Sequence, residues 1–265
     1  MRPNEAKRRL QSGRPILGAT VSCASPLVAE VMGHLGYDWV LLDLQHGENN
    51  LGNIAALLTA VSATPTTPWV RVVSNDGPLI QRVLDLGAYG VVVPLVNNAQ
   101  EAEAAVRAMR YPPTGDRSWG PIRGALYGGP DYHAGADREL QLVVMIETNE
   151  GIKNASEIFA IDGVDGCLIG TNDFSLSFGL PPRPVPDTSP MDPRVEEAVQ
   201  QVLEAALAHG KAAGIFTTDA EMASARVRQG FQIISMLGDL AGLRAGCGAM
   251  LRSVRATADA AEDGR

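Results

Sequence analysis

Residues 69–109 read WVRVVSNDGPLIQRVLDLGAYGVVVPLVNNAQEAEAAVRAM. Two short apolar runs, Trp69–Val73 and Gly90–Pro94, each precede a segment with helical periodicity, Gly77–Leu86 and Ala99–Met109. Short runs rich in Val, Ile and Leu without polar alternation indicate strands that are buried on both faces, as in a parallel sheet. The stretch therefore predicts two consecutive β/α units.

The same alternation extends along the whole chain. The other predicted strands are Ile16–Ser22, Trp39–Leu44, Leu142–Glu147, Gly166–Gly170, Gly214–Thr217 and Gln232–Met236, and the other predicted helices are Pro26–Leu35, Leu51–Ser62, Gly151–Ala160, Pro193–His209, Ala220–Gln229 and Leu240–Ala261. Strands that are each followed by a helix predict an α/β fold, a closed (β/α)₈ TIM barrel, for which 265 residues are sufficient. An open doubly wound sheet is the alternative, and the lack of a G-x-G-x-x-G motif after the first strand weakens it.

Two segments depart from this rhythm within what we interpret as one domain, residues 1–265. Residues 111–138 contain Tyr-Pro-Pro-Thr-Gly and further glycines, and residues 180–193 are rich in proline. Both are predicted as long loops near the active-site face. Each is either a surface linker or, most clearly for the proline-rich segment, a wall of the site.

Composition excludes several classes of partner. The formal net charge is -8 and no clustered Lys/Arg run is present, which argues against nucleic acid and against anionic membranes. Cys23, Cys167 and Cys247 are far apart in the sequence, as expected for reduced thiols in the cytoplasm. No apolar stretch is long enough to span a bilayer. We expect a cytoplasmic enzyme that acts on small molecules.

Polar residues at the carboxyl ends of strands are the informative positions in such a barrel. Glu147 and Asp173 end neighbouring predicted strands, so their carboxylates should converge. Two carboxylates repel unless one is protonated or a cation lies between them. Oxygen ligands favour a hard divalent cation such as Mg²⁺ or Mn²⁺ and leave positions open for substrate. The alternative is that each acid caps the helix that follows it.

Arg71 and His46 complete this rim. Arg71 lies inside an apolar strand, where a guanidinium needs a partner or a ligand, and it suits a carboxylate or an enolate oxygen. A structural ion pair with a barrel acid is its alternative role. His46 precedes Gly47 and is a candidate general base, or a histidine that only supports the site.

The lysines bear on the type of mechanism. The sequence has three, Lys7, Lys153 and Lys211, and none is predicted to project from a strand end into the barrel. A Schiff-base aldolase needs a desolvated lysine there, so the sequence favours stabilisation of an enolate by a metal. No nucleotide cofactor is expected.

Several collinear motifs together carry a resemblance. They are residues 36–47 (GYDWVLLDLQHG), 69–72 (WVRV), 82–94 (RVLDLGAYGVVVP), 110–117 (RYPPTGDR), 146–147 (IE) and 163–174 (GVDGCLIGTNDF). Taken in order, they resemble the HpcH/HpaI class II pyruvate aldolases, the 4-hydroxy-2-oxoheptanedioate and 2-dehydro-3-deoxyglucarate aldolase group. The family is a (β/α)₈ barrel of the phosphoenolpyruvate/pyruvate-domain type.

The resemblance implies a role for each rim residue. Glu147 and Asp173 would bind Mg²⁺, Mn²⁺ or Co²⁺, and Arg71 would stabilise a pyruvate enolate. His46 would be the general base, and Asp85 would raise its basicity. The implied reaction is the reversible cleavage of a 4-hydroxy-2-oxo acid to pyruvate and an aldehyde. The alternatives are a lyase that acts on a CoA thioester and an oxaloacetate lyase or decarboxylase on the same barrel.

The resemblance also implies contacts with the substrate and between subunits. The backbone amides of Asn172 and Asp173 would hold the pyruvate carboxylate, which agrees with a helix that begins there. The assembly would be a homohexamer, a trimer of dimers that exchange their last helices. The sequence departs from the family's motifs in three places: Met145 replaces a glutamine that touches the oxo acid, Gln45 replaces the glutamate before the histidine, and residues 170–174 (GTNDF) stand for Gly-Pro-x-Asp-Leu. In the first strand, Thr20 stands where relatives carry an aromatic residue. We therefore expect a different or bulkier aldehyde.

Overall fold

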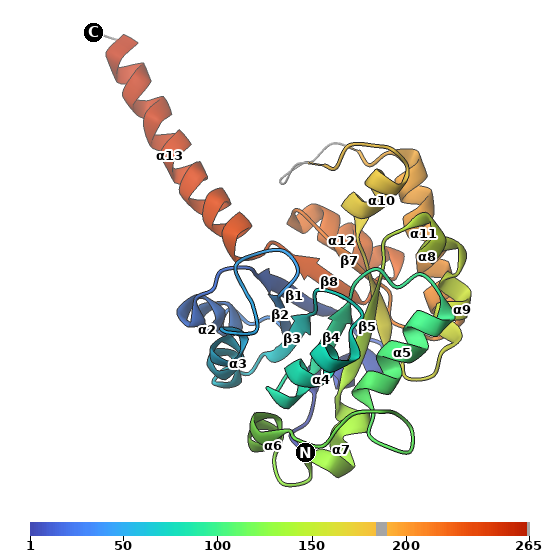
Figure 1. Cartoon of the computed structure of the whole chain (residues 1–265). Helices are drawn as coiled ribbons and strands as arrows, with labels where there is room; N and C mark the ends of the chain where they lie inside the picture. The colour runs from blue at the N-terminus through green and yellow to red at the C-terminus, as the bar shows by residue number, and fades with distance from the viewer. Residues whose placement is uncertain (184–189, 264–265) are drawn as a thin grey trace.

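The computed structural model describes residues 1–183 and 190–263 of the chain. Within these residues, parallel strands in chain order form a closed barrel with the order β1-β2-β3-β4-β5-β6-β7-β8 (Figure 1). The strands are β1 Ile16–Val21, β2 Trp39–Asp43, β3 Thr67–Arg71, β4 Gly90–Val93, β5 Gln141–Ile146, β6 Gly166–Ile169, β7 Gly214–Phe216 and β8 Ile233–Met236. The predicted (β/α)₈ barrel is confirmed, and the pairing of β1 with β8 that closes it rules out an open sheet.

Helices surround the barrel. They are α2 Pro26–His34, α3 Ile54–Ser62, α4 Gly77–Asp85, α5 Ala99–Met109, α8 Asn149–Lys153, α9 Ala155–Ala160, α10 Thr171–Ser177, α11 Pro193–Ala208 and α12 Ala220–Gln229. A further helix, α13 Asp239–Asp263, follows β8. Polar residues begin most of them: Asp76, for example, accepts a hydrogen bond from the Leu79 N–H and caps α4. Because α4 and most of the other helices follow a strand, their starts lie at the rim formed by the carboxyl ends of the strands.

Two tryptophans fill the interior of the barrel. Trp39 on β2 and Trp69 on β3 stack with their ring centroids 4.4 Å apart. Glycines make room for both rings, because a Cβ atom at Gly18 would lie 2.2 Å from Trp39 and one at Gly90 would lie 2.3 Å from Trp69. The interior is thus a packed core rather than a channel, and it supports the rim from below.

Helix α1, Glu5–Gln11, closes the opposite end of the barrel. Lys7 is buried there, and its Nζ donates to the Leu140 carbonyl oxygen at 2.7 Å and lies 2.9 Å from Asp165 Oδ1. This end holds the amino ends of the strands. It is therefore a structural end, in keeping with the position of catalytic groups at the other rim in barrels of this kind.

The prediction for residues 111–138 is wrong. They contain two helices, α6 Ile122–Gly128 and α7 Tyr132–Glu139, and they lie beside the amino terminus at the end far from α13 (Figure 1). The Arg2 N–H donates to the Gly128 carbonyl, and the Asn4 N–H donates to Glu139. A segment that leads from a helix into the next strand reaches the amino ends of the strands, so it cannot line the active-site face.

Only part of the proline-rich segment 180–193 belongs to the described residues, because residues 184–189 lie outside them. Its first part is tied to α10. The Arg183 N–H donates to Asn172 Oδ1 at 3.0 Å, which brings residue 183 to the rim of the barrel. Its predicted role as a wall of the site stays a prediction.

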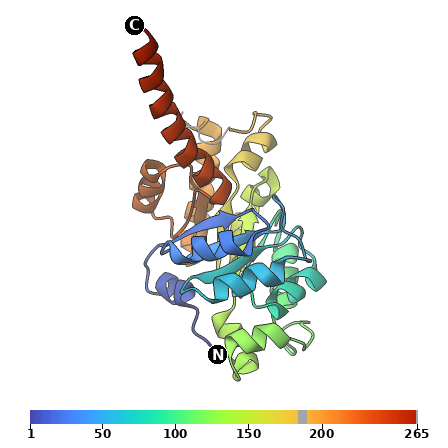
Figure 2. The same cartoon turned by 90° about the vertical axis from the view of Figure 1, so that its left-hand side faces the viewer.

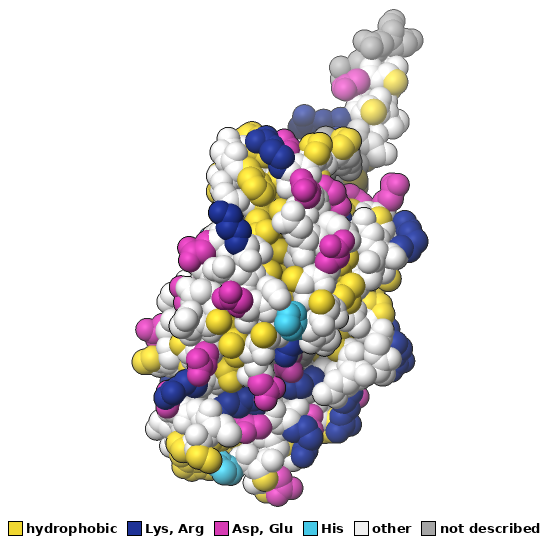
Figure 3. Space-filling view, turned by 90° about the vertical axis from the view of Figure 1, so that its right-hand side faces the viewer, with side chains coloured by type: hydrophobic (Ala, Val, Ile, Leu, Met, Phe, Trp, Pro, Cys, Tyr) yellow, Lys and Arg dark blue, Asp and Glu magenta, His cyan; other side chains and the backbone are white. Residues whose placement is uncertain are grey.

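Helix α13 leaves the barrel and extends away from it (Figures 1 and 2). Its apolar side chains are exposed, among them Leu243, Met250, Leu251 and Val254. A long helix without tertiary packing gains little stability in water. No helix among the described residues has the length and apolar character that crossing a membrane requires. On the face over α5, α9 and α11, acidic and basic side chains are interspersed (Figure 3).

Candidate active site

Two carboxylates meet at the rim of the barrel, as predicted. Glu147 follows β5 and Asp173 lies in the first turn of α10, which follows β6, and the two strands pair through Ile146 and Ile169. Gly170 lies between the two acids. A Cβ atom on Gly170 would lie 2.7 Å from Glu147 Oε2 and 3.2 Å from Asp173 Oδ2, so the absence of a side chain there gives both carboxylates room to converge.

Glu147 carries an unfavourable charge in this position. It is 3% exposed, and burial raises its pKa to about 7, with the charge of Asp173 adding to the increase. A hydrogen bond from the Leu95 N–H at 2.7 Å and the positive charge of Arg71 oppose it. Leu95 adopts a left-handed backbone conformation with φ of 55°, which is uncommon for this residue type. The backbone there directs its N–H at Glu147.

These features fit a divalent cation. Two carboxylates converge, one of them is buried without full compensation, and both offer the oxygen atoms that Mg²⁺ and Mn²⁺ prefer. In the part of the chain that the structure describes, no three His, Cys, Asp or Glu side chains are grouped to hold a metal ion. The protein would therefore supply two ligands and leave the other coordination positions open.

Arg71, the last residue of β3, forms the second element of the site. Its Nε and Nη2 donate to Asp43 Oδ1 and Oδ2 at 2.8 Å and 2.6 Å. The ion pair considered as an alternative role is therefore present. Because the ion pair occupies only Nε and Nη2, Nη1 takes no part in it and lies 3.7 Å from the sulfur of Met145. Sulfur is a weak acceptor, so Nη1 can still donate to an anionic ligand.

Asp43 is a further residue of the site, to which no function was assigned from the sequence. It is the last residue of β2 and pairs directly with Arg71 in the register of β2 and β3. Opposite charges at the same level of adjacent strands would have indicated the pair. The pair holds the guanidinium plane in one orientation before any ligand arrives.

His46 lies on the same rim, in the loop between β2 and α3, and its side chain is exposed. It makes no hydrogen bond to any residue that the structure describes, so the loop alone fixes its position. Next to it, Gly47 has φ of 147°, and a Cβ atom there would lie 2.9 Å from the Ser22 carbonyl oxygen. A glycine is required for this close approach.

Asp85 does not lie beside His46 within one chain, contrary to the expected arrangement. It ends α4, which runs antiparallel to the strands, so it lies near their amino ends. There, Arg117 Nη2 donates to Asp85 Oδ1 at 2.9 Å. Any contact between Asp85 and His46 has to come from a second copy of the chain.

A cavity of about 190 Å³ adjoins the site between β1, β7, β8 and α10. Its lining includes Thr20, Asn172, Phe216, Thr218 and Leu237. The cavity adjoins two residues of the candidate site. Asn172, which lines it, directly precedes Asp173, and the ring of Phe216 lies 5.8 Å from the Arg71 guanidinium. Thr20 is thus placed beside the candidate site.

The lysines lie away from this rim. Lys7 is at the amino end of the barrel, Lys153 ends α8, and Lys211 directs its Nζ toward the Ile161 carbonyl oxygen. That the mechanism uses no Schiff-base lysine stays a prediction.

Comparisons with known proteins agree with this geometry. A family model described as HpcH/HpaI aldolase/citrate lyase matches residues 18–244. A hydroxypyruvate/pyruvate aldolase of Rhizorhabdus wittichii is 36% identical over 253 residues, which cover 96% of this chain and 99% of the relative. A 4-hydroxy-2-oxo-heptane-1,7-dioate aldolase of Klebsiella pneumoniae is 35% identical over 236 residues, 88% of this chain and 87% of the relative.

A solved structure shares the fold over nearly its whole length. The HpcH/HpaI aldolase/citrate lyase family protein from Burkholderia cenocepacia superposes with a TM-score of 0.88 at 31% identity, covering 95% of this chain and 99% of that one. The predictions of an aldolase and of a carbon–carbon lyase are confirmed by these relatives. By sequence and by fold, the chain belongs to the HpcH/HpaI aldolase/citrate lyase family.

Proposed function

We propose that this enzyme cleaves a 4-hydroxy-2-oxo acid to pyruvate, or a close 2-oxo acid, and an aldehyde, with a divalent cation held by Glu147 and Asp173. The observation that carries the proposal is the convergence of these two carboxylates at Gly170, beside a preoriented Arg71. Bound there, Mg²⁺, Mn²⁺ or Co²⁺ supplies positive charge that stabilises an enolate.

The side chains around the pair bind and orient the 2-oxo acid. Arg71 Nη1 donates to an oxygen that gains negative charge during cleavage, since its other two donor nitrogens are committed to Asp43. The Asn172 and Asp173 amides hold the carboxylate of the substrate. Met145 is buried and offers no hydrogen-bond donor to the oxo group, so Arg71 carries more of that role.

His46 moves the proton that cleavage requires. Its exposure at the rim gives it access to a substrate hydroxyl, either directly or through water. A histidine can take up and release a proton near neutral pH. Asp85 supports it from a neighbouring copy of the chain.

The cavity beside the site receives the aldehyde part of the substrate. Phe216, Leu237 and Thr20 line this cavity. The Phe216 ring lies 5.8 Å from the Arg71 guanidinium, and Thr20 belongs to β1. Threonine leaves space that a larger side chain would fill. The aldehyde is therefore bulkier than a one- or two-carbon fragment.

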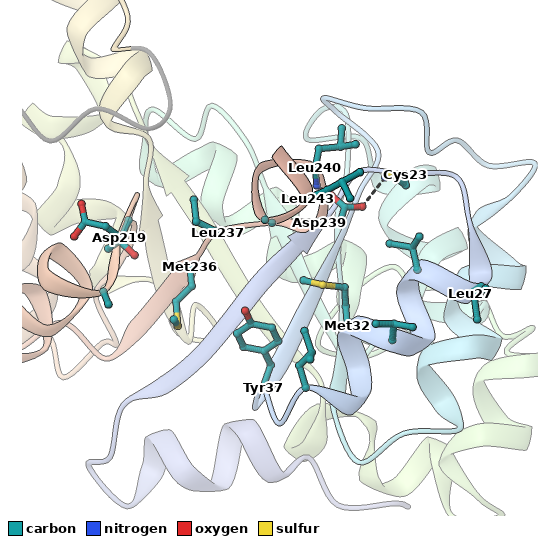
Figure 4. A pocket seen from close by; sticks show the side chains of 17 residues that line it. Cys23, Leu27, Met32, Tyr37, Asp219, Met236, Leu237, Asp239, Leu240 and Leu243 are labelled. Atoms are coloured by element: carbon teal, nitrogen blue, oxygen red, sulfur yellow. Dashed lines mark hydrogen bonds between the residues drawn. The ribbon is translucent and has the colours of Figure 1, made fainter. Parts of the chain in front are cut away.

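A second copy of the chain covers α13, in line with the predicted exchange of last helices. An apolar groove of about 720 Å³ runs between α2 and the start of α13, and Figure 4 shows Leu27, Met32, Tyr37, Leu240 and Leu243 along it. The exposed apolar side chains of α13 match this groove in character. A helix of the partner in the groove would bury both surfaces.

A second apolar surface near Asp85 supports a contact with another subunit. Trp119, Ile122 and Leu126 are 61%, 90% and 85% exposed on and before α6. They lie near Asp85, since the Cβ position of Gly120 is 3.7 Å from Asp85 Oδ2. Two distinct contact surfaces on one chain are what a hexamer built from dimers needs.

Activity with and without metal tests the proposal. Pyruvate release from a panel of 4-hydroxy-2-oxo acids should stop in EDTA and return with Mg²⁺, Mn²⁺ or Co²⁺. Glu147→Ala should be inactive, whereas Glu150→Ala, on the exposed start of α8, should retain activity. Full activity in EDTA would contradict the metal site. Turnover of oxaloacetate or of a CoA thioester, with none of the hydroxy-oxo acids, would assign the chain to a different lyase reaction.

A further inference from the structure

The carboxylate of Asp239, the first residue of α13, binds the end of β1. The Ser22 N–H donates to both oxygens of Asp239 at 3.0 Å and 3.1 Å. The Cys23 N–H donates to Asp239 Oδ2 at 2.9 Å (Figure 4). Asp239 also accepts from the Leu240 N–H at 2.8 Å, within its own helix. One side chain thus joins the start of α13 to the residues that follow β1.

The same residues that follow β1 hold the loop that carries His46. The Ser22 carbonyl accepts a hydrogen bond from the Glu48 N–H at 3.0 Å, and Asn49 Nδ2 donates to the Val21 carbonyl at 2.8 Å. The Glu48 carboxylate also accepts a hydrogen bond from the Ala24 N–H. Ser22 is therefore bound by Asp239 at its N–H and by the His46 loop at its carbonyl.

The other end of the loop is held at the catalytic rim. The Gln45 N–H donates to Asp43 Oδ1 at 3.0 Å, and Asp43 in turn binds Arg71. His46 lies between these two anchors, and its own side chain has no hydrogen bond to the described residues. The position of its imidazole therefore depends on how both ends of the loop are held.

We propose that Asp239 is a positioning residue for His46, acting through the backbone of Ser22 and Cys23. Release of Asp239 frees one of the two anchors, while Arg71, Glu147 and Asp173 stay fixed by the barrel. Because Asp239 is the first residue of α13, a different orientation of α13 would also alter the position of His46 through the same contacts. The kinetic part of this inference rests on the proposed role of His46 in proton transfer.

Nuclear magnetic resonance tests the positioning without any reference to turnover. The chain has four histidines, so the imidazole resonances are few, and His46→Ala identifies that of His46. In Asp239→Ala, we expect the His46 resonance to shift. The matched control is Asp76→Ala, which removes an aspartate that caps α4 and has no bond to the His46 loop. In the control, the His46 resonance should be unchanged.

Kinetics supply the second measurement. In Asp239→Ala, kcat should fall by about tenfold to a hundredfold, the range that misplacement of a reacting group produces. The KM for the 2-oxo acid and the metal affinity should stay within about twofold, because they depend on strand-end residues. Asp239→Asn keeps one acceptor oxygen but turns the other into an NH2 donor that faces a backbone N–H, so it should restore only part of kcat.

Two results would overturn the inference. One is a folded Asp239→Ala variant with the wild-type His46 resonance and kcat. The other is an equal loss of kcat and of metal affinity, which would indicate general disruption. By contrast, wild-type turnover in His46→Ala would refute the proposed role of His46 and leave the resonance comparison intact as a test of positioning.

Discussion

Replacement of Glu147 by glutamine should stabilise the metal-free protein at high pH while it abolishes activity. Glu147 is buried and its pKa is raised from 4.5 to about 7, chiefly by desolvation. A carboxyl group whose pKa is higher in the folded than in the unfolded chain opposes folding when it ionises. Glutamine has the same shape, can still accept the hydrogen bond from the Leu95 N–H, and carries no charge.

The size of the effect follows from the two pKa values. Below pH 4.5, the carboxyl group is protonated in both states and the substitution should change little. Between pH 4.5 and 7, the unfolded chain ionises first, so the wild-type protein loses stability as the pH rises. Above pH 7 the difference is complete at about 3 kcal/mol, from 1.36 kcal/mol per pKa unit. For a chain of this length, it corresponds to a Tm difference of about 5 to 10 °C.

Thermal unfolding in EDTA, followed by circular dichroism from pH 5 to 9, measures this difference. Glu139→Gln is the matched control, because Glu139 is also buried and yet has the opposite shift. Burial alone would raise its pKa, but hydrogen bonds from the Asn4 N–H and Arg138, with the charge of Arg8, lower it. Glu139→Gln should therefore destabilise the protein at neutral pH and have less effect in acid.

A metal ion should reverse the order of stability. With saturating Mg²⁺ or Mn²⁺, the wild-type protein gains binding energy that Glu147→Gln cannot gain. Equal Tm values for both proteins in EDTA at pH 9 would refute this prediction, since they would mean that the ionised Glu147 carboxylate does not destabilise the folded protein. A Tm difference that is the same at pH 5 and pH 9 would refute it as well.

Three other substitutions test separate parts of the structure. Asp43→Asn weakens a buried ion pair with Arg71, so urea unfolding should show a loss of roughly 3 kcal/mol and KM for the 2-oxo acid should rise; an unchanged KM would contradict the assigned orientation. Thr20→Leu narrows the adjoining cavity, so KM for bulky aldehydes should rise in the condensation direction, with proton exchange of pyruvate unaffected. Leu243→Asp should lower the mass measured by light scattering, whereas Leu207→Asp, on the exposed end of α11, should not.

The barrel was predictable because each strand is apolar along its whole length. Burial on both faces leaves no polar alternation, and in a barrel the second face is the interior. The exact limits of the strands differ from the prediction at residues such as Thr67 and Pro68, which begin β3 before the apolar run at Trp69. Thr67 and Pro68 belong to β3 because they pair with Trp39 and Val40 of β2. Pairing between two distant strands leaves no pattern in the local sequence.

The segment 111–138 shows where local reasoning fails. Its prolines and glycines predict loops. The prolines all lie outside the helices, but Gly124 and Gly128 belong to α6 and Gly135 belongs to α7. The buried residues Tyr132, Ala136 and Glu139 are spaced three or four apart, a weak helical signal that the surrounding turn residues obscured. Tertiary contacts with the amino terminus, such as that of Asn4 with Glu139, stabilise the segment.

The site was predictable where strand order decides position. Arg71 ends β3, Glu147 directly follows β5, and Asp173 lies in the turn of helix after β6, and the carboxyl ends of strands in a closed parallel barrel share one rim. Asp85 was not predictable in this way because it ends a helix, and its position relative to His46 depends on assembly. The role of Asp43 depends on register across two strands, which a sequence indicates only once both strand ends are known.

The stacked tryptophans have a consequence for how such an enzyme can diversify. Trp69 lies on β3 two residues before Arg71, and Trp39 locks it against β2, which ends in Asp43. A larger residue at Gly18 or Gly90 would displace this stack and, with it, the charges above it. Thr20 and His46 do not depend on it, because they face the cavity and the solvent. Substitutions in the loops and at the mouth of the barrel can therefore change the substrate range. The charged residues proposed to bind the enolate keep their positions, because the packed interior beneath them leaves little room for larger side chains.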